Sequence, residues 1–358
     1  MALPFWNSGV RKRRDQIVAV DLGARTTKAV HIHRRGDGFV LSRYALLDAP
    51  IFEKSLPVEL LSEHLKAVNH AMEGKCKWLA LTLGVNDALV RHIELPPMPA
   101  EDMRMVLKNN SRVYLQQDLS GYVFDCQAAS PDPQSKSAEP GKGPPGQQKQ
   151  KVLVAGAKKQ LIDDFVLAAK NAGFIPDHIL PVVIGPVNAF ERAMPAIFQK
   201  DSAALVDIGF KSSSISIVQE RELILNRVVG IGGDRLTAGL AESMNISYAE
   251  AEGIKIGMAN EVQSALESLL TPLGRELRAS LDFFEHQHDR PVSQVFLSGG
   301  SSRSDFVVES LRRELIADCK TWNPTTFLKL TLSPEQAAEI EHVAPQLTAA
   351  IGAALTAL

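Results

Sequence analysis

The sequence lacks the features of a disulfide-rich, zinc-ribbon or membrane-spanning protein. Its three cysteines, Cys76, Cys126 and Cys319, are far apart and form no CxxC pair, so neither a disulfide framework nor a zinc ribbon is expected. No apolar run approaches the roughly 20 residues needed to cross a bilayer. The 39 basic and 41 acidic side chains sum to a formal charge of −2, which leaves no overall basic field for nucleic acid.

What is present is the composition of a large folded protein. Of its 358 residues, 45% are hydrophobic and 22% are charged, values close to the globular average, and the length suits two domains. Residues 1–6 are apolar, but the basic cluster at 11–14 follows them, which is the reverse of a secretion signal. We therefore expect a cytoplasmic protein in which residues 1–15 form a flexible basic tail.

A short pattern occurs twice, about half the chain apart. In each copy an apolar run ends in an acid, a glycine follows in a turn, and a hydroxyl pair begins a second β-rich run. The copies align without gaps at Asp21, Gly23, Thr26 and Thr27 in the first, and at Asp207, Gly209, Ser212 and Ser213 in the second. The offset is 207 − 21 = 186 residues. The repetition predicts two related α/β halves.

Each of these turns has the residues of an anion-binding loop. Glycine lets backbone N–H groups turn toward an anion, and Lys28 is a candidate compensating cation. Asp21 and Asp207 are expected to face each other and to hold Mg²⁺ through water, because Mg²⁺ sheds its hydration reluctantly. Since both acids end a strand near solvent, we expect neither to be needed for the core. The alternative is two ordinary β-turns with solvated acids.

Two further segments carry glycines at the start of helices. Residues 230–234 (GIGGD) open a helix, and the helix after it carries Glu252 and Lys255 three residues apart, where a solvated ion pair is the alternative. Residues 295–303 (VFLSGGSSR) form a strand that runs into two glycines. Bare backbone there leaves room for a flat ring, although a plain strand-to-helix turn would have the same glycines.

One internal segment has the composition of a disordered loop. Residues 130–150 contain almost no apolar side chain and many prolines and glycines, so they cannot bury enough surface to offset the entropy of ordering. They include a literal GxGxxG, but the two prolines that follow its second glycine prevent the helix that a dinucleotide site requires. The flanking runs are strand-like and predict a hairpin, so the loop lies inside one domain.

The four glycine-containing segments, in this order, resemble the phosphate-1, phosphate-2 and adenosine segments of the actin, Hsp70 and sugar-kinase superfamily. They read DLGARTTK at 21–28, DIGFKSS at 207–213, GIGGD at 230–234 and LSGGSSR at 297–303. Within that superfamily the chain resembles the PilM family of type IV pilus assembly proteins. The stretches that carry this second resemblance lie at 90–107, 152–174 and 233–255, with APQLTAAIGAAL near the end.

The resemblance implies an α/β protein with a duplicated actin-like (ribonuclease H-like) fold, in which two domains surround a nucleotide cleft. Domain 1 is expected over 16–188, with an inserted subdomain at about 84–157 that contains the 130–150 loop. Domain 2 is expected over 189–340. A C-terminal helix at 341–358 would pack back on domain 1.

The resemblance also implies ATP and Mg²⁺ as cofactors, with Asp21 and Asp207 as the metal-binding acids. Arg25 stands where the first turn usually has a small residue, and Phe210 adds bulk to the second turn. The other nucleotide-binding residues that it implies are Gly23, Ala24, Arg25, Thr26, Lys28, Gly209, Lys211, Ser212, Ser213, Gly232, Gly233, Glu252, Lys255, Gly299, Gly300, Ser301 and Arg303.

For function, the resemblance implies a pilus assembly component at the inner face of the inner membrane. It would bind the cytoplasmic tail of a PilN-like membrane protein beside the inserted subdomain, where Met98, Met103 and Met105 are candidate contacts, and would meet other assembly components or further copies of itself. Nucleotide would bias closure of the two halves.

Two other functions stay open, along with weak ATP hydrolysis by the pilus component. A sugar-kinase-like phosphotransferase would need a carboxylate base beside a substrate hydroxyl, and no residue is nominated for that role. A degenerate actin-like scaffold would bind partners but no nucleotide.

Overall fold

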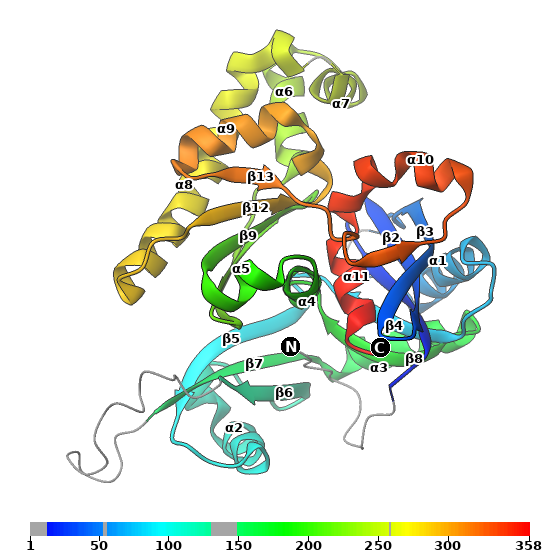
Figure 1. The fold of residues 1–358 in the computed structure, drawn as a ribbon, viewed down its shortest axis with the longest axis vertical. Coiled ribbons are helices and arrows are strands. Elements are labelled where there is room, and N and C mark those ends of the chain that lie inside the picture. The colour runs from blue at the N-terminus through cyan, green and yellow to red at the C-terminus, as the bar shows by residue number, and fades with distance from the viewer. Residues whose placement is uncertain (1–12, 53–55, 130–148, 258) are drawn as a thin grey trace.

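The computed structural model describes residues 13–52, 56–129, 149–257 and 259–358. Nearly all of the expected tail at 1–15 and of the expected loop at 130–150 therefore lies outside the described residues. Two large sheets and one small sheet organise the described chain (Figure 1).

The first large sheet, which we call the first domain together with its helices, has the strand order β14-β3-β2-β1-β4-β8. β1 pairs antiparallel with β2 and parallel with β4. Residues 17–20 of β1 are fully buried, as the continuous apolar run of a central strand predicts. The strands are β1 (Gln16–Leu22), β2 (Thr26–Arg35), β3 (Gly38–Asp48), β4 (Trp78–Leu83), β8 (Ile175–Pro181) and β14 (Leu328–Leu330).

The second large sheet, which with its helices forms the second domain, has the order β11-β10-β9-β12-β13. β9 pairs antiparallel with β10 and parallel with β12, so this sheet repeats the order and the strand directions of β3-β2-β1-β4-β8. The expected duplicated α/β fold is confirmed. The strands are β9 (Ser202–Ile208), β10 (Ser213–Gln219), β11 (Glu222–Val229), β12 (Gln294–Ser298) and β13 (Cys319–Thr321).

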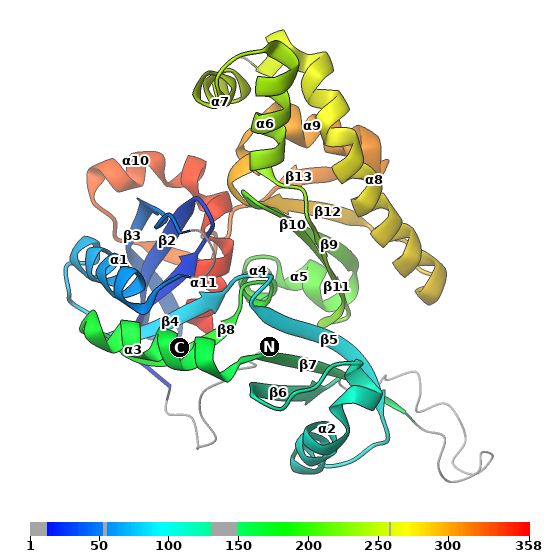
Figure 2. The same cartoon turned by 180° about the vertical axis from the view of Figure 1, so that it is seen from behind.

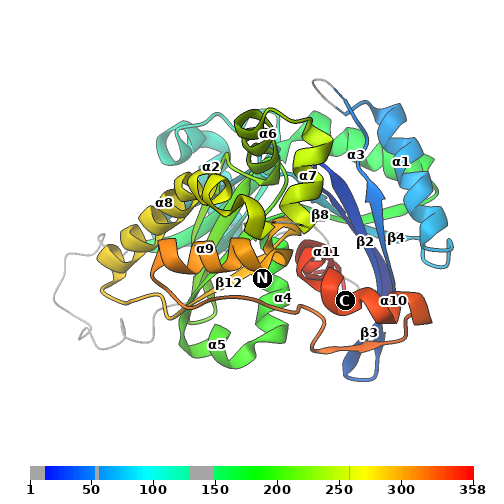
Figure 3. The ribbon, with the colours of Figure 1, turned by 90° about the horizontal axis from the view of Figure 1, so that it is seen from above.

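Helices cover the sheets in groups. In the first domain, α1 (Val58–Ala71) and α3 (Lys159–Asn171) lie side by side (Figures 2 and 3). In the second domain, α8 (Gln263–His288) packs against α9 (Asp305–Leu315), and α6 (Gly233–Met244) against α7 (Tyr248–Gly257). The short helices are α5 (Pro195–Lys200), η2 (Ala259–Val262), η3 (Gly300–Arg303) and η4 (Ala344–Gln346).

Two helices cross closely in the core of the first domain. α4 (Ile184–Ala193) packs against α11 (Thr348–Leu355), and α11 also contacts β1. Glycines meet at the crossing: a Cβ atom added at Gly352 would lie 1.7 Å from the carbonyl oxygen of Gly185. The crossing therefore depends on the absence of a side chain at this point.

A small subdomain is inserted between β4 and α3. Its sheet has the order β5-β7-β6, with β5 (Ala88–Leu95), β6 (Tyr122–Ala128) and β7 (Gln150–Lys158), and α2 (Ala100–Leu115) packs against it. β6 and β7 pair antiparallel, as the strand-like runs beside the 130–150 loop predict. Its separate core contains Leu95, Met103, Leu107, Cys126, Val152 and Val154.

The expected boundary of domain 2 at residue 340 is wrong. β14 pairs in parallel with β3 of the first sheet. In α10 (Pro334–Val343), the Gln336 side chain donates to the Tyr44 carbonyl over 2.5 Å. The chain therefore returns to the first domain by Leu328. A strand of three residues has no alternation long enough to predict this pairing from the sequence.

Arg14, which was expected in the basic tail, is bound to the first domain. The backbone N–H of Arg14 donates to the carbonyl of Ala357 over 2.9 Å. Its guanidinium pairs with Asp177 at 2.6 Å and lies 3.4 Å from the ring centroid of Trp78. Arg14 therefore belongs to the first domain rather than to a tail.

Candidate nucleotide site

Two acids occupy equivalent places in the two domains. β1 carries Asp21 near its C-terminal end, and β9 carries Asp207 in the same way. The Thr82 hydroxyl, on β4, donates to Asp21 Oδ1 over 2.9 Å. The Ser298 hydroxyl, on β12, donates to Asp207 Oδ2 over 3.0 Å. Each domain therefore positions its acid with a hydroxyl from the neighbouring parallel strand.

Sequence reasoning missed Thr82 and Ser298. The only signal for them is a single hydroxyl near the end of an otherwise apolar strand, WLALTL in one domain and VFLS in the other. Such a hydroxyl is also common where nothing is bound, so the parallel pairing of the strands was needed to find its partner.

Lys28 supplies positive charge to both acids. Its ammonium donates to Asp21 Oδ2 over 3.0 Å. Burial lowers the pKa of Lys28, but the charges of Asp21 and Asp207 and the hydrogen bond to Asp21 outweigh burial and raise the pKa overall. Burial raises the pKa of Asp207, against the opposing influence of Lys28 and Ser298. Lys28 therefore stays charged between the two domains.

One expectation about Asp21 is wrong. Its residue is only 6% exposed, and both carboxylate oxygens accept hydrogen bonds from within the first domain. Removing Asp21 would leave the buried ammonium of Lys28 without its hydrogen-bonded partner, which is costly. Asp21 therefore contributes to folding as well as to the site.

The two turns after the acids need glycine. A Cβ atom at Gly23 would lie 2.5 Å from the Thr26 carbonyl oxygen, and one at Gly209 would lie 2.7 Å from that of Ser212. These tight turns also contain Ala24 and Lys211. The Ser213 hydroxyl, an expected ligand donor, instead donates to the Ile231 carbonyl over 2.7 Å. It therefore fastens the 230–234 segment to the second turn.

The other glycine segments meet at the start of α6. The Gly233 N–H donates to the Gly209 carbonyl over 2.9 Å. A Cβ atom at Gly233 would lie 2.8 Å from Ser301 Oγ and 3.8 Å from Lys255 Nζ. At Gly232 a Cβ atom would lie 2.4 Å from the Phe210 carbonyl oxygen. Three of the four predicted segments, at 207–213, 230–234 and 297–303, therefore lie together.

The double-glycine turn after β12 combines a strained and an open glycine. Gly299 has φ +89°, and a Cβ atom there would lie 2.5 Å from the Ile208 carbonyl oxygen, so only glycine suits the position. At Gly300 the nearest atom to a Cβ would be Gln346 Oε1, at 3.7 Å. The backbone of Gly300 is therefore open on the side where a Cβ atom would lie. Arg303, farther along, contacts His342 of α10.

Glu252 and Lys255 form a largely buried pair rather than a solvated one. Their charged groups are 2.6 Å apart, and their side chains are 15% and 12% exposed. The ammonium also donates to Thr237 Oγ1 over 2.6 Å, and Thr237 donates to Glu252. Burial raises the pKa of Glu252, but these hydrogen bonds and charges lower it overall. Glu252 therefore stays ionised.

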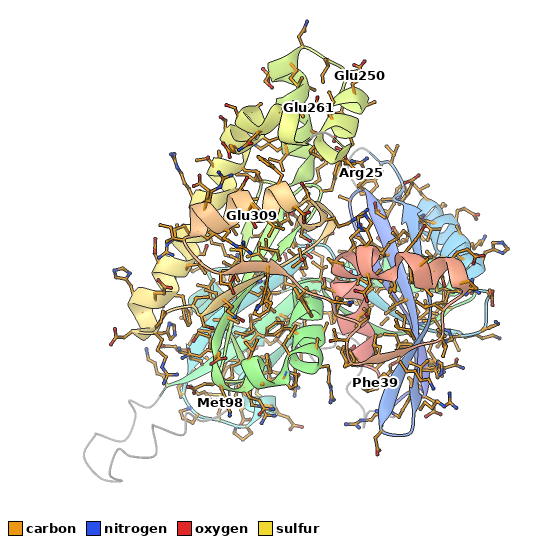
Figure 4. The ribbon with its side chains drawn as sticks, turned by 45° about the horizontal axis from the view of Figure 1, so that its top comes forward. Arg25, Phe39, Met98, Glu250, Glu261 and Glu309 are labelled. Carbon is orange, nitrogen blue, oxygen red and sulfur yellow. The ribbon has the colours of Figure 1, made fainter. Side chains whose placement is uncertain are left out.

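Arg25 links the first turn to the second domain. Its Nη1 donates to Glu252 Oε1 over 2.6 Å, and its guanidinium carbon lies 5.3 Å from the ring centroid of Phe210. Figure 4 shows Arg25 on the first domain, facing the part of the second domain that carries Glu250. Lys211 lies close by and pairs with Asp234 at 2.6 Å. We call the surroundings of Asp21, Lys28, Asp207, Arg25, Phe210, Glu252, Lys255, Gly233 and Gly300 the interdomain site.

The chemistry of the interdomain site differs from that of a metal centre built from protein ligands alone. Among the described residues, no group of three or more His, Cys, Asp or Glu side chains could hold a metal ion. A cavity of about 730 Å³ lies elsewhere, at the start of β1, and is lined by residues that include His31, Arg43 and Lys75. A metal at Asp21 and Asp207 would therefore take most of its ligands from water or from a bound anion.

The duplicated sheets and the paired acids define this molecule as a protein of the actin-like fold. A solved PilM–PilN type IV pilus biogenesis complex is similar, with a TM-score of 0.81, 21% identity and coverage of 97% of this chain and 99% of that chain. EutJ from Carboxydothermus hydrogenoformans is similar with a TM-score of 0.57, 14% identity and coverage of 97% and 92%.

The family model of the type IV pilus assembly protein PilM matches residues 19–358, and the chain belongs to this family. EutJ of Escherichia coli K12 is 26% identical over 148 residues, which are 41% of this chain and 48% of that protein. FtsA of Bacillus subtilis 168 is 27% identical over 103 residues, 29% of this chain and 22% of that protein. Each of these two matches spans less than half of the relative's own length. In the described part of the chain, no helix is long and apolar enough to cross a membrane.

Proposed function

We propose that this chain is a nucleotide-binding assembly component of a type IV pilus machinery, acting at the inner face of the inner membrane. It binds ATP and Mg²⁺ in the interdomain site. It also holds the cytoplasmic tail of a PilN-like membrane protein beside the inserted subdomain. The family of the chain supports the pilus role. The observation that supports the nucleotide role is that the acids of both turns lie near enough to Lys28 to act on its charge.

The donor set fits a nucleotide. The two turns are too tight for a side chain at Gly23 or Gly209, and Lys28, Lys211 and Lys255 provide positive charge for phosphate. The open backbone face at Gly300 suits a flat base. Asp21 and Asp207 offer carboxylates of the kind that hold a hydrated Mg²⁺, which would neutralise phosphate charge when bound. Arg25 contacts both Glu252 and Phe210 in the same interdomain site.

Equilibrium titration of a fluorescent ATP analogue, with and without Mg²⁺, tests the nucleotide role. We expect Asp207→Asn to reduce the Mg²⁺-dependent gain in affinity at least tenfold while the far-ultraviolet circular dichroism stays that of wild type. Glu309→Gln, on an exposed part of α9, is the matched control and should bind as wild type does. A wild type that binds no analogue would favour the degenerate scaffold, and release of ADP only with a sugar would favour the phosphotransferase.

The partner site is proposed on α2 of the inserted subdomain. Of the three methionines expected as partner contacts, Met103 is only 3% exposed and belongs to the subdomain core, so it is not available. Met98 is partly buried against that core. Met105 is 60% exposed and Val113 is 75% exposed on the same helix. Flexible and apolar side chains of this kind suit a short peptide with a few apolar anchors.

Calorimetry with a synthetic peptide of a PilN-like cytoplasmic tail tests the partner site. We expect Met105→Glu and Val113→Glu each to weaken binding at least tenfold, because a charge there prevents desolvation of the apolar contact. Ile316→Glu, 84% exposed at the end of α9, is the control and should leave affinity unchanged. If all three variants bound the peptide with the affinity of wild type, the tail would bind outside α2.

A further inference from the structure

One polar contact of the interdomain site links the first turn to the second domain. Arg25 and Glu252 are 227 residues apart in sequence, yet Arg25 Nη1 lies 2.6 Å from Glu252 Oε1. Arg25 directly precedes β2, and its carbonyl accepts a hydrogen bond from the Ala49 N–H over 2.9 Å. The backbone of Arg25 is therefore fixed to the first domain, while its side chain reaches the second.

The acceptor of this contact is equally fixed, but to the second domain. Glu252 is held by Lys255 at 2.6 Å and by the hydroxyl of Thr237. Lys255 in turn donates to the Gly233 carbonyl over 3.3 Å, at the start of α6. The Phe210 ring, 5.3 Å from the Arg25 guanidinium, offers the same cation a second attraction. Opening the two domains would break both of these contacts at once.

We propose that Arg25 is a latch that holds the two domains together at the interdomain site. Its guanidinium bridges to Glu252 and Phe210, so the closed arrangement is favoured before any nucleotide arrives. The consequence for nucleotide, which rests on the function proposed above, is that ATP enters or leaves while the Arg25–Glu252 ion pair is broken. Arg25 thus sets the rates of nucleotide exchange.

The charges around the latch favour this role over that of a simple surface ion pair. The Arg25 side chain is 44% exposed, but that of Glu252 is only 15% exposed, so the carboxylate is less screened by solvent than in an exposed pair. Glu252 also pairs with a second cation, Lys255. Glu252 therefore remains paired when its ion pair with Arg25 breaks. The latch can therefore open without leaving a buried charge alone, as a reversible contact requires.

The latch can be measured without nucleotide. Spin labels at Leu167→Cys on α3 and Ile316→Cys at the end of α9 report the distance between the domains, since both positions are exposed and the three native cysteines are buried. We expect Arg25→Ala to raise the ratio of open to closed molecules about fivefold, the effect of losing one partly exposed ion pair and its ring contact. Arg25→Lys should restore part of the closed population.

Two controls decide whether Arg25 acts through Glu252. Arg43→Ala removes an arginine–glutamate pair that lies inside the first domain and should leave the distance distribution unchanged. In a Glu252→Gln background, where only the contact with Phe210 is left to lose, Arg25→Ala should open the domains less than it does in the wild-type background. An Arg25→Ala distribution equal to that of wild type, or an undiminished effect in the Glu252→Gln background, would overturn the latch.

The kinetic consequence is tested separately by stopped flow with a fluorescent ATP analogue. We expect Arg25→Ala to raise the association and dissociation rate constants by similar factors of about five, with a smaller change in Kd, because the ion pair breaks on both paths. Unchanged rate constants in a protein that does bind the analogue would refute the gating role. A wild type that binds no analogue would refute the proposed nucleotide function, and the spin-label distances would still decide whether the latch exists.

Discussion

Replacing Lys28 with methionine tests how far the acid pair depends on its single ammonium. The Lys28 and Asp21 side chains are 17% and 8% exposed. Removing one partner of a buried ion pair costs about 3–5 kcal/mol, and the residual exposure here favours the lower limit, about 3 kcal/mol. For a domain of this size, that loss corresponds to a fall in Tm of about 6–12 °C at pH 7.5.

The pH dependence of the loss has a defined sign. Burial raises the pKa of Asp207 in the folded protein, and the charge of Lys28 opposes that rise, so the loss of the ammonium raises the Asp207 pKa further above that of the unfolded chain. The folded variant then binds more protons than the unfolded one as the pH falls, which stabilises it. The Tm difference between wild type and Lys28→Met should therefore shrink from pH 7.5 to pH 5.

Thermal unfolding followed by circular dichroism measures both effects. Lys66→Met is the matched control, because Lys66 pairs with Glu63 on α1 at 2.7 Å with both side chains more than half exposed. Its Tm should stay within about 2 °C of wild type. The reasoning fails if the two variants have the same Tm, or if the deficit of Lys28→Met grows as the pH is lowered.

Three further predictions concern single positions. Ser298→Ala removes the hydroxyl donor of Asp207 and should lower the free energy of unfolding by about 1 kcal/mol in urea titrations; no change would mean that water replaces the hydroxyl. Gly352→Ala should destabilise by more than about 2 kcal/mol, because its Cβ atom would collide with the Gly185 carbonyl oxygen, and a smaller loss would show that α4 and α11 can move apart. Burial lowers the pKa of His31 to about 4, so wild-type stability should fall as the pH drops from about 6.5 toward 4. His31→Asn should reduce the change in the urea midpoint over this pH range. An unchanged dependence of the midpoint on pH would exclude His31 as its source.

Much of the architecture could be predicted because it depends on residues that are close together in the sequence. The repeated run of apolar residues, acid, glycine and hydroxyl pair predicted the duplication, and the two sheets have the same strand order and directions. The four glycine segments were expected in one site, and contacts such as that between Gly233 and Gly209 bring three of them together. Glycine turns and long apolar strands impose conformations that depend mainly on neighbouring residues.

The contacts that could not be predicted from the sequence join residues that are far apart in the chain. Nothing local to Arg25 indicates that its guanidinium reaches Glu252, and nothing local to Thr82 indicates that it donates to Asp21. The early return of the chain to the first domain at Leu328 depends on pairing between β14 and β3. Each of these contacts follows from how the domains and strands come together, which composition and periodicity do not encode.

The near-symmetry of the interdomain site is broken at one position, with a consequence for the orientation of a ligand. Lys28 lies opposite Asp21 in the β1–β2 pairing, and Ser214 lies opposite Asp207 in the β9–β10 pairing. These four residues would carry no net charge if both acids faced a lysine. They would carry two negative charges if both acids faced a serine. With one lysine the set carries a single negative charge, located toward the second domain. A molecule with one charged end and one neutral end therefore faces a different charge on each domain. One of its two orientations is favoured by charge alone.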